Sequence, residues 1–362
     1  MLIGIDASRA VTASPTGTEV YSRRLLRALV ALGSSHCFRF YFRSAPPVGD
    51  FPDAELRVIS CPRLWTHLGL AWEMARRPPD VLFVPAHVLP PIHPRASLVT
   101  VHDLGYLHFP EAHPWRQRLY LDLSTRWNAR AAAHLLADSE ATRADLMAHY
   151  RTSPEKITVA YPGCDEALAP VRDPAVVEAA KARYGIAGDY LLYLGTLQSR
   201  KNLARVVAAF ATLQSEAVLV LAGKRGWLYD DLFTQARRAG LEGRVLFPGY
   251  VSDGDKAALL SGALAFVFPS LYEGFGLPVL EAQACGCPVI TSTTSSLPEA
   301  AGNAALLVNP EDTAAVAGAL QRIAAEPGLR QALVERGLAN VRRFSWAACA
   351  RSVLSVIEQR VV

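Results

Sequence analysis

Two glutamates stand eight positions apart in the segment Glu273-Gly-Phe-Gly-Leu-Pro-Val-Leu-Glu281. The apolar run Ala265-Phe-Val-Phe-Pro269 before them predicts a short buried strand. Pro278 suits the first position of a helix, and Gly286 suits the end of the same helix. We therefore expect Glu273 on the loop that leaves the strand and Glu281 in the first turn of the helix.

The predicted helix start offers a place for an anion. Backbone N–H groups around Gly276 and Leu277 would point outward from the helix N-terminus, where the helix dipole favours negative charge. The two carboxylates beside this turn could accept hydrogen bonds from sugar and ribose hydroxyls while the amides hold phosphate. This combination of groups suggests a nucleotide-sugar site.

A second group of polar residues follows another predicted strand, in Gly195-Thr-Leu-Gln-Ser-Arg200-Lys201-Asn202. Arg200 can present a planar fork to phosphate oxygens, and Lys201 supplies a compact positive charge. Asn202 is a candidate helix cap. Two such cations could also be solvated surface charges. Their expected place at the carboxyl end of a strand, near the anion-binding turn, favours a grip on a diphosphate.

Polar residues in the first half of the chain also end a predicted strand. His102 and Asp103 follow the buried run Val99-Thr-Val101. His102 could hydrogen-bond a sugar hydroxyl or help to position an acceptor, or it could serve the fold alone. Asp103 could orient the His102 imidazole or cap the next turn, and both roles fit the sequence.

Gly17 lies in the loop Ser14-Pro-Thr-Gly-Thr-Glu19, which precedes a predicted helix. A glycine lets a ligand approach the backbone closely, and a helix start favours phosphate. A plain capping loop, with Thr18 as the N-cap, explains the same residues, so both interpretations stay open.

The composition excludes several classes of protein. With 362 residues, 51% of them hydrophobic and 19% charged, the chain is long enough for two domains with proper cores. A net charge of only +4 argues against nucleic-acid binding. The chain opens into a predicted strand rather than a signal peptide, and no apolar run reaches the roughly 20 residues that span a bilayer.

Cysteine and glycine motifs narrow the chemistry further. The six cysteines lack a CxxC pair, and Cys285-Gly-Cys287 is too tightly spaced for a usual zinc site. We therefore expect small buried thiols in a reducing compartment and no metal. No GxGxxG follows the first strand, and no GxxxxGK[ST] occurs anywhere, which argues against a dinucleotide oxidoreductase and a P-loop NTPase.

Strand and helix patterns alternate twice along the chain, which implies parallel sheets covered by helices on both faces. Strands are predicted at Leu2–Ile5, Phe38–Phe42, Arg57–Ile59, Val81–Val84, Leu98–Val101, Leu135–Ala137, Ile157–Val159, Tyr190–Leu194, Ala217–Ala222, Val245–Phe247, Ala265–Phe268, Pro288–Ile290 and Ala305–Val308. Helices are predicted near Glu19–Leu32, Leu68–Arg76, Trp115–Ala133, Ala141–His149, Val176–Tyr184, Asn202–Leu213, Tyr229–Ala239, Asp255–Ser261 and Thr313–Ala325.

Prolines and glycines between 162 and 189 interrupt this alternation and mark a domain boundary. We predict an N-terminal Rossmann-like domain over 1–170 and a C-terminal one over 171–345. The last helix, 346–362, is expected to cross back onto the first domain. Since such folds bind ligands outside the carboxyl ends of their strands, the active site is expected in the cleft between the domains.

Several motifs of the chain resemble those of a known family. The motifs EGFGLPVLE and ACGCPVI look like the signature of the retaining nucleotide-sugar glycosyltransferases of family 4, and other segments fall in the expected order: DASRA and TGTEVYSRRLLRAL, VHDL, ADSEATRADL, YLGTLQSRKNL and GYVSDGDKAALLSGA. The resemblance implies an α/β protein of the GT-B fold, with two Rossmann-like domains whose parallel sheets face each other across a deep cleft. The first domain would then read the acceptor and the second the donor.

The resemblance also implies roles for the donor-binding residues. Glu281 would hold the ribose hydroxyls. Arg200 and Lys201 would neutralise the diphosphate, helped by the backbone of Gly276 and Leu277.

Further roles follow for the ends of the donor. By resemblance, Glu273 would lie against the transferred sugar, and His102 would contact that sugar from the other domain. Val251 is a candidate for base contact. Backbone at Gly17 would help with the diphosphate, although the loop reads TGT rather than the double glycine common in relatives, which puts a direct phosphate contact by Thr18 in doubt.

The implied reaction is retaining transfer of a hexose, with GDP-mannose as the first donor candidate and UDP-hexoses next. No cofactor or metal is expected, because Arg200 and Lys201 would take the place of a divalent ion. The pair Asp253-Gly-Asp255 could hold an ion in principle, but it opens a predicted helix and suits a cap and first-turn charge better. We expect attack from the leaving-group face, with a phosphate oxygen accepting the acceptor's proton. A covalent intermediate on Glu273 is the alternative.

The acceptor is expected to be a glycan, a lipid-linked sugar or a small molecule. Aromatic and basic residues mix in Leu64–Trp72, at Arg76-Arg77 and around Trp115 and Arg116, and they could touch a membrane or simply belong to packed helices. The expected location is the cytoplasm, with peripheral contact at the inner face of the plasma membrane as an option. The alternatives for function are a nucleotide-sugar epimerase, a glycan phosphorylase and a non-catalytic sugar-nucleotide-binding partner.

Overall fold

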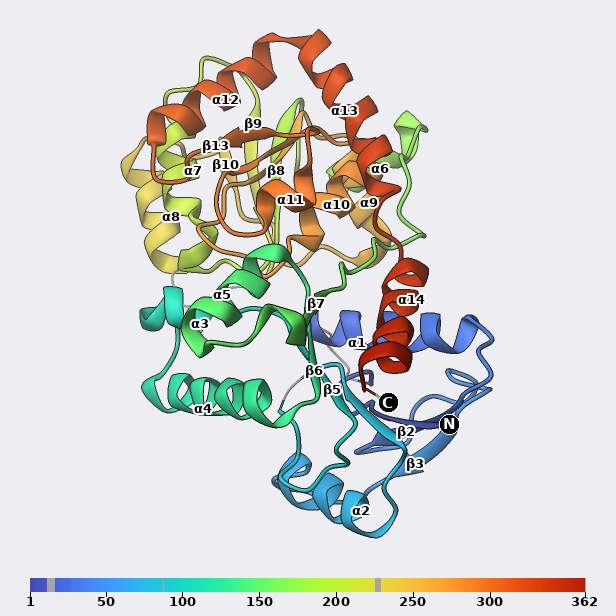
Figure 1. Ribbon diagram of the computed structural model, residues 1–362. Coiled ribbons are helices and arrows are strands. Elements are labelled where there is room, and N and C mark those ends of the chain that lie inside the picture. The colour runs from blue at the N-terminus through green and yellow to red at the C-terminus, as the bar shows by residue number, and fades with distance from the viewer. Residues whose placement is uncertain (12–16, 87, 225–228, 362) are drawn as a thin grey trace. The chain divides into compact units, whose positions relative to one another are not determined.

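The computed structural model describes residues 1–11, 17–86, 88–224 and 229–361 (Figure 1). Contacts divide the chain into two units: an N-terminal unit of Met1–Gly163 with Phe344–Val362, and a C-terminal unit of Cys164–Arg343. The chain leaves the N-terminal unit once and returns to it with its last helix. The units part at Gly163 and Phe344, near the predicted boundaries at 170 and 345.

The N-terminal unit is built on a parallel sheet of seven strands in the order β3-β2-β1-β4-β5-β6-β7. The strands are β1 (Leu2–Asp6), β2 (Cys37–Phe42), β3 (Glu55–Val58), β4 (Val81–Val84), β5 (Ser97–Val101), β6 (His134–Ala137) and β7 (Ile157–Val159). All seven predicted strands of this half are present, and most are marked by buried apolar runs. The edge strand β3 is the exception, because it is largely exposed and begins two residues before the predicted Arg57.

Helices cover both faces of this sheet. They are α1 (Gly17–Ala31), the π-helical turn η1 (Thr66–Leu70) running into α2 (Ala71–Arg76), α3 (Gly105–His108), the 3-10 turn η2 (Pro110–Ala112), α4 (Trp115–Ala131), α5 (Glu140–Tyr150), the 3-10 turn η3 (Pro154–Lys156), α14 (Trp346–Val356) and the π-helical turn η5 (Ile357–Val361). Along β4, Phe83 packs with residues of α1 and α14, whereas Leu82 packs with Trp65 and with α2, α4 and α5. The strand alternation therefore builds two apolar layers.

The C-terminal unit has a parallel sheet of six strands in the order β10-β9-β8-β11-β12-β13. The strands are β8 (Tyr190–Leu194), β9 (Val218–Ala222), β10 (Val245–Leu246), β11 (Ala265–Phe268), β12 (Val289–Ser292) and β13 (Leu306–Val308). The chain runs outward from β8 through β9 to β10, then restarts at β11 on the other side of β8. The order therefore reverses between β8 and β11, and this is where ligands bind in open parallel sheets.

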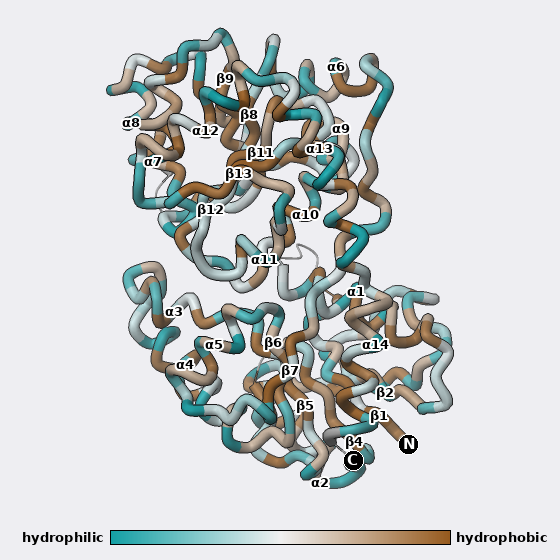
Figure 2. The backbone as a smooth tube through the Cα atoms, turned by 45° about the horizontal axis from the view of Figure 1, so that its top comes forward, coloured by the Kyte–Doolittle hydropathy of each residue, from teal (hydrophilic) through white to brown (hydrophobic). Residues whose placement is uncertain are grey.

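The remaining helices surround this second sheet, whose strands carry the hydrophobic colour in Figure 2. They are α6 (Pro174–Arg183), the 3-10 turn η4 (Ser199–Lys201), α7 (Leu203–Phe210), α8 (Tyr229–Arg238), α9 (Asp253–Ser261), α10 (Leu277–Ala284), α11 (Leu297–Ala301), α12 (Thr313–Ala325) and α13 (Pro327–Val341). The sequence analysis did not predict α3, α11 or α13. The two parallel-sheet α/β units confirm the predicted fold class.

Two further expectations concern the cysteines and the possibility of membrane-spanning helices. Four of the six cysteines are buried as free thiols, but Cys37 is exposed and Cys61 is partly exposed, so the expectation of small buried residues is wrong for these two. Among the helices that the structure describes, none is both long and apolar enough to cross a bilayer.

Glycines at the carboxyl ends of β8 and β9 bring two backbones into close contact. Gly195 and Gly223 have φ of 153° and 147°, which L side chains rarely adopt. A Cβ atom built on Gly223 would lie 1.8 Å from the carbonyl oxygen of Gly195. This strand-end edge therefore requires glycine at position 223.

We expect Gly223→Ala to destabilise the C-terminal unit by at least about 2 kcal/mol, since strain and overpacking add. Gly318→Ala is the matched control, because Gly318 lies within α12 and a Cβ there would meet nothing within 4 Å. That control should stabilise the unit by about 0.5–1 kcal/mol. Urea unfolding measures both, and equal effects of the two variants would contradict the close approach.

Candidate functional site

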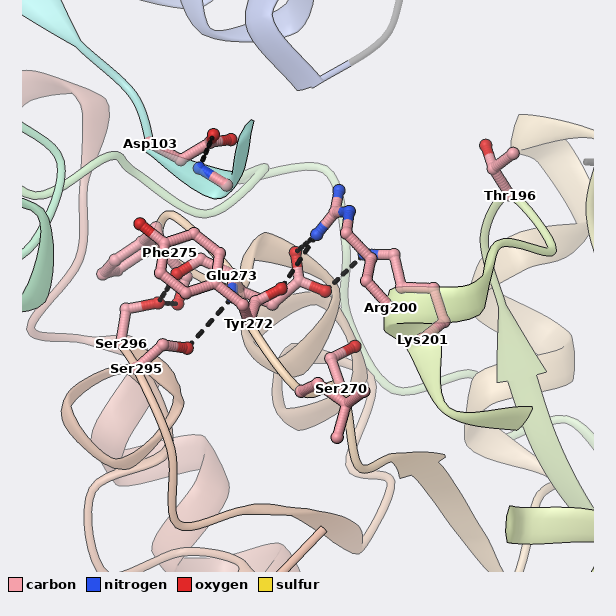
Figure 3. Close-up of polar contacts among 12 residues, drawn as sticks. Asp103, Thr196, Arg200, Lys201, Ser270, Tyr272, Glu273, Phe275, Ser295 and Ser296 are labelled. Carbon is pink, nitrogen blue, oxygen red and sulfur yellow. Dashed lines mark hydrogen bonds and ion pairs between the residues drawn. The ribbon is translucent and has the colours of Figure 1, made fainter. Parts of the chain in front are cut away.

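Three charged residues meet at the point where the strand order of the C-terminal unit reverses (Figure 3). Arg200 and Lys201 belong to η4, the turn that follows β8, while Glu273 lies on the loop that follows β11. Their elements are joined directly, because the backbone N–H of Leu271 donates to the carbonyl of Arg200 at 2.8 Å. The sequence therefore placed the cations and the carboxylate correctly at neighbouring strand ends.

Glu273 forms ion pairs with both cations. Its Oε2 accepts a hydrogen bond from Arg200 Nη1 at 3.0 Å, and its Oε1 pairs with Lys201 Nζ. Arg200 Nη1 also donates to the carbonyl of Tyr272 at 2.9 Å, and Lys201 Nζ lies 4.8 Å from the ring centre of Phe268. Lys201 and Glu273 are each only 8% exposed, so this cluster is largely withdrawn from water.

The cluster keeps its charges in spite of burial. Burial by itself would raise the pKa of Glu273, but the nearby charges on Lys201 and Arg200 outweigh it and the pKa is lowered. Two cations against one carboxylate leave a net positive charge. An incoming phosphate would therefore meet cations that have already lost most of their water.

Two serines from the loop after β12 hold the Glu273 loop in place. The backbone N–H of Glu273 donates to Ser295 Oγ at 3.0 Å. Ser296 Oγ lies 2.8 Å from the carbonyl oxygen of Glu273 and 2.9 Å from that of Phe275, and it is completely buried. The sequence analysis missed both serines, although their place after a predicted strand was a usable signal.

The helix start after this loop differs slightly from the prediction. Gly276 is the N-cap of α10 with φ of 109°, so Leu277 is the first helical residue and Pro278 the second. Glu281 is the fifth residue and lies in the second turn, not in the first as expected. A side chain at position 276 would meet Leu297 Cδ2 at 2.8 Å, so glycine is needed there.

Glu281 has a cationic partner that the sequence analysis did not name. Lys256 Nζ lies 3.2 and 3.3 Å from the two carboxylate oxygens of Glu281. Burial raises the pKa of Glu281. Burial opposes the charge on Lys256 as well, yet Glu281 outweighs this and the pKa of Lys256 is raised. The pair keeps a partly exposed carboxylate in place on α10.

Two further residues of this unit behave differently from expectation. Asn202 takes a left-handed conformation before α7, and its side chain makes no capping bond to that helix. Its amide instead donates to the carbonyls of Pro269 and Pro310, so the predicted cap is wrong and Asn202 ties three loops together. Val251 is 8% exposed and packs in the hydrophobic core, so its side chain offers little surface to a ligand.

The acidic pair at 253 and 255 lies in the first turn of α9, as predicted. Ser252 caps the helix, and Asp255 accepts hydrogen bonds from Arg183 and Tyr184. Hydrogen bonds from Arg183, Ser252 and Tyr184 lower the pKa of Asp255 to about 2. Asp255 is thus engaged in holding α6 to α9, which suits a cap rather than an ion site.

In the N-terminal unit, His102 follows β5 and pairs with a residue at the end of β6. His102 Nδ1 lies 2.7 Å from Asp138 Oδ2. Burial disfavours the imidazolium, but Asp138 outweighs this and raises the pKa of His102. Asp103 is not the orienting group: it accepts from the backbone N–H of Gly105 at 2.9 Å and so caps the next turn. The sequence analysis missed Asp138.

Other features of this unit bear on ligand binding. Gly17 begins α1, and a Cβ there would meet nothing within 4 Å, whereas residues 14–16 of the predicted loop lie outside the described residues. Within the described ranges, one group has ligand atoms close enough to hold a metal ion: His108, Asp145 and His149, all within 4.8 Å of one another. This group lies on α3 and α5 and includes none of the site residues named above.

Comparison with known families gives two matches that together span most of the chain. The model described as Glycosyltransferase Family 4 matches residues 15–168, and the model described as Glycosyl transferases group 1 matches residues 178–339. The two matched regions lie one in each structural unit, apart from a few residues at the boundary.

Individual proteins of similar sequence and structure agree with these matches. The chain is 33% identical over 264 residues to the O-antigen chain mannosyltransferase B of Escherichia coli, covering 72% of this chain and 69% of that protein. It is 32% identical over 180 residues to the serotype-specific mannosyltransferase WbdA of Escherichia coli, covering 48% of this chain and 22% of WbdA, so it spans about a fifth of that protein's length. Its fold is similar to sucrose-phosphate synthase from Thermosynechococcus elongatus, with a TM-score of 0.78 over 99% of this chain and 98% of the other at 22% identity.

Replacing Glu273 by glutamine should destabilise the C-terminal unit by about 2–4 kcal/mol at pH 7, because two cations lose their buried partner. The folded-state pKa lies below the ordinary 4.5, so ionisation of Glu273 stabilises the fold above that pH. This contribution is lost as the pH falls below about 4.5 toward the lowered pKa.

Urea unfolding at several pH values should therefore show the Glu273→Gln deficit shrinking in acid. Glu335→Gln, which removes an exposed carboxylate of α13, serves as the control and should change little at any pH. A Glu273→Gln deficit that is constant from pH 7 to pH 3 would contradict the ion-pair interpretation.

Proposed function

The chain belongs to glycosyltransferase family 4, and we propose that it transfers a hexose from a nucleotide diphosphate sugar with retention of the anomeric configuration. Our first donor candidate is GDP-mannose, because two of the similar proteins are named as mannosyltransferases. UDP-hexoses come second. The observation that carries the proposal is the buried pairing of Arg200 and Lys201 with Glu273 beside the strand-order reversal.

Breaking the bond between an anomeric carbon and phosphate builds negative charge on the departing diphosphate. In our proposal, Arg200 and Lys201 stabilise that charge, with help from the amides of Gly276 and Leu277 and from the backbone of Gly17. Such groups act most strongly in a site from which water is excluded, and they need no reorganisation during the reaction. The burial of Lys201 supports this role.

The remaining roles are assigned along the donor. Glu281 would accept hydrogen bonds from the ribose diol, with Lys256 keeping its carboxylate in position, and the backbone at Val251 would contact the base. Glu273 and His102 would contact the transferred sugar. Asp138 would fix the orientation of the His102 ring through the 2.7 Å contact.

The proposed step is attack from the leaving-group face, with a phosphate oxygen taking the proton of the acceptor hydroxyl. The lowered pKa of Glu273 and its two ion pairs favour a binding role over a nucleophilic one, because both carboxylate oxygens are already engaged. No divalent ion is required, since the two cations do the work of neutralising the diphosphate.

We further propose that the acceptor is a glycan or a lipid-linked sugar. The reaction would then take place in the cytoplasm, with the protein in peripheral contact with the inner face of the plasma membrane. The match to an O-antigen chain mannosyltransferase supports this class of acceptor.

The proposal predicts which nucleotide stabilises the protein. In a thermal-shift screen of GDP, UDP and ADP, GDP should raise the melting temperature most, because a ligand that binds only the folded state stabilises it. Mannose should then appear in the α configuration in the product, as it is in GDP-mannose, and EDTA should leave the rate unchanged. Stabilisation by UDP alone would move the donor to a UDP-hexose, and an inverted product would contradict retention.

Two substitutions test the diphosphate end and the ribose end of the proposed donor site separately. Lys201→Ala should lower kcat/KM by roughly 30- to 1,000-fold, which corresponds to about 2–4 kcal/mol of lost transition-state stabilisation, because the leaving group loses a buried cation. Glu281→Ala should instead weaken binding of free GDP, measured by calorimetry. Arg336→Ala, which removes an exposed arginine of α13, is the control and should match the wild type. Normal kinetics for Lys201→Ala would remove that lysine from the site.

A further inference from the structure

The N-terminal unit contains a basic cavity that none of the roles above uses. It has a volume of about 620 Å³ and lies between the C-terminal halves of α4 and α5 and the turn η3. Four of its lining residues are cations, namely Arg126, Arg130, Arg151 and Lys156, and none is acidic. A cavity with this lining suits a phosphate group.

The position of Arg151 indicates that this cation is not incidental. Arg151 ends α5 in a left-handed conformation with φ of 53°, a place where glycine or asparagine is usual. Such a conformation costs a non-glycine residue roughly 1 kcal/mol or more. The chain nevertheless places an exposed arginine there, at the rim of the cavity.

A hydroxyl group in the cavity wall still lacks a partner. Thr152 is 7% exposed, and its Oγ1 is buried with no hydrogen-bond partner among the described residues. Buried hydroxyls are normally hydrogen-bonded, so a small turn of this side chain toward an anion in the cavity would give the hydroxyl a partner. Thr152 and Arg151 are neighbours in sequence and line the same cavity.

Nearby groups leave most of the positive charge available. Asp122 pairs with Arg126 at 3.0 Å and also accepts a hydrogen bond from the hydroxyl of Tyr150. Lys156 donates to the carbonyls of Ala129 and Arg130 and so is fixed at the end of α4. The side chains of Arg130 and Arg151 make no hydrogen bond or ion pair within the part of the chain that the structure describes. These two arginines are free to turn toward an anion.

An exposed apolar ridge runs along α4 beside the cavity. Trp115, Leu119, Leu123 and Trp127 are 65%, 50%, 55% and 38% exposed, and their spacing puts them on one side of the helix. Arg130 shares this side, and Figure 1 shows α4 as an outer helix of the N-terminal unit. Apolar residues of this size rarely stay exposed in a row without a partner.

The ridge continues onto η1 and α2. The hydroxyl oxygen of Tyr120 on α4 lies 3.3 Å from His67 Nε2 on η1. A second, apolar cavity of about 260 Å³ is lined by residues of α4, of η1 and of the segment after β4. Beyond His67, Leu68 and Trp72 are 58% and 63% exposed, and Arg76 lies over the Trp72 ring at 5.6 Å. Exposed tryptophans with arginines beside them are typical of the surface between lipid headgroups and acyl chains.

We propose that this face binds acidic phospholipid, with a headgroup phosphate in the cavity of Arg130, Arg151 and Thr152 and with the α4 ridge at the level of the glycerol backbone. The inference rests on the peripheral membrane contact proposed above and gives it a specific site. Basic and apolar side chains together bind anionic membranes more strongly than either kind alone.

Flotation with lipid vesicles tests the proposal directly. The full chain should bind vesicles of phosphatidylcholine with 30% phosphatidylglycerol (a composition of roughly physiological charge) and should not bind pure phosphatidylcholine. The double variant Arg130→Gln/Arg151→Gly should bind about 25-fold more weakly, at about fivefold for each arginine. Glycine at 151 suits the left-handed conformation, so the variant should fold at least as well as the wild type.

Two controls complete the experiment. Arg351→Ala removes an exposed arginine of α14 in the same unit and should bind as the wild type does. The double variant Trp115→Ser/Leu119→Ser should bind the vesicles more weakly, although Arg130 and Arg151 are both retained. Thermal shift with inorganic phosphate and light scattering without lipid are run beside the flotation.

Each contrary result has a defined meaning. Stabilisation by inorganic phosphate without vesicle binding would assign the cavity to a soluble phosphate and overturn the lipid site. Self-association without vesicle binding would assign the ridge to a second copy of the chain and also overturn it. Equal loss in Arg351→Ala would show a nonspecific charge effect. Because lipid binding is measured without donor or acceptor, these outcomes are independent of sugar transfer.

Discussion

The buried carboxylate of Glu273 between Arg200 and Lys201 is the interaction on which the strand-end edge of the C-terminal unit depends. Two cations this close would repel each other by several kcal/mol at an effective dielectric constant of roughly 20. Glu273 removes that repulsion and joins the turn after β8 to the loop after β11. Ser295 and Ser296 then hold the loop itself. The cations are thus fixed before any phosphate arrives.

In the proposed function, a phosphate group entering the site would compete with Glu273 for Arg200 and Lys201. It would gain from charges that are already ordered and largely dry. The carboxylate released in part from the cations can then accept hydrogen bonds from sugar hydroxyls. In the proposed function, one ion-pair cluster would therefore serve both the stability of the unit and the selection of a diphosphate sugar.

Sequence patterns were sufficient to predict the strands and the positions of the charged residues that follow them. Arg200, Lys201 and Glu273 could be placed because each lies in the connection that follows a buried apolar strand. Pairings between distant segments could not be predicted in this way: Asp138 lies 36 positions from His102, and Lys256 lies 25 positions from Glu281. Such contacts depend on how helices and loops pack. The helix α13 was missed because Pro327 and Gly328 break the pattern, although proline is well suited to the helix's first turn.

A crystal structure of the protein with a non-hydrolysable nucleotide diphosphate sugar is the most direct test of the proposed diphosphate site. We expect phosphate oxygens within hydrogen-bond distance of Arg200 and Lys201, with Glu273 turned from at least one cation toward the sugar. A bound diphosphate far from both cations, with the two Glu273 ion pairs unchanged, would contradict this assignment.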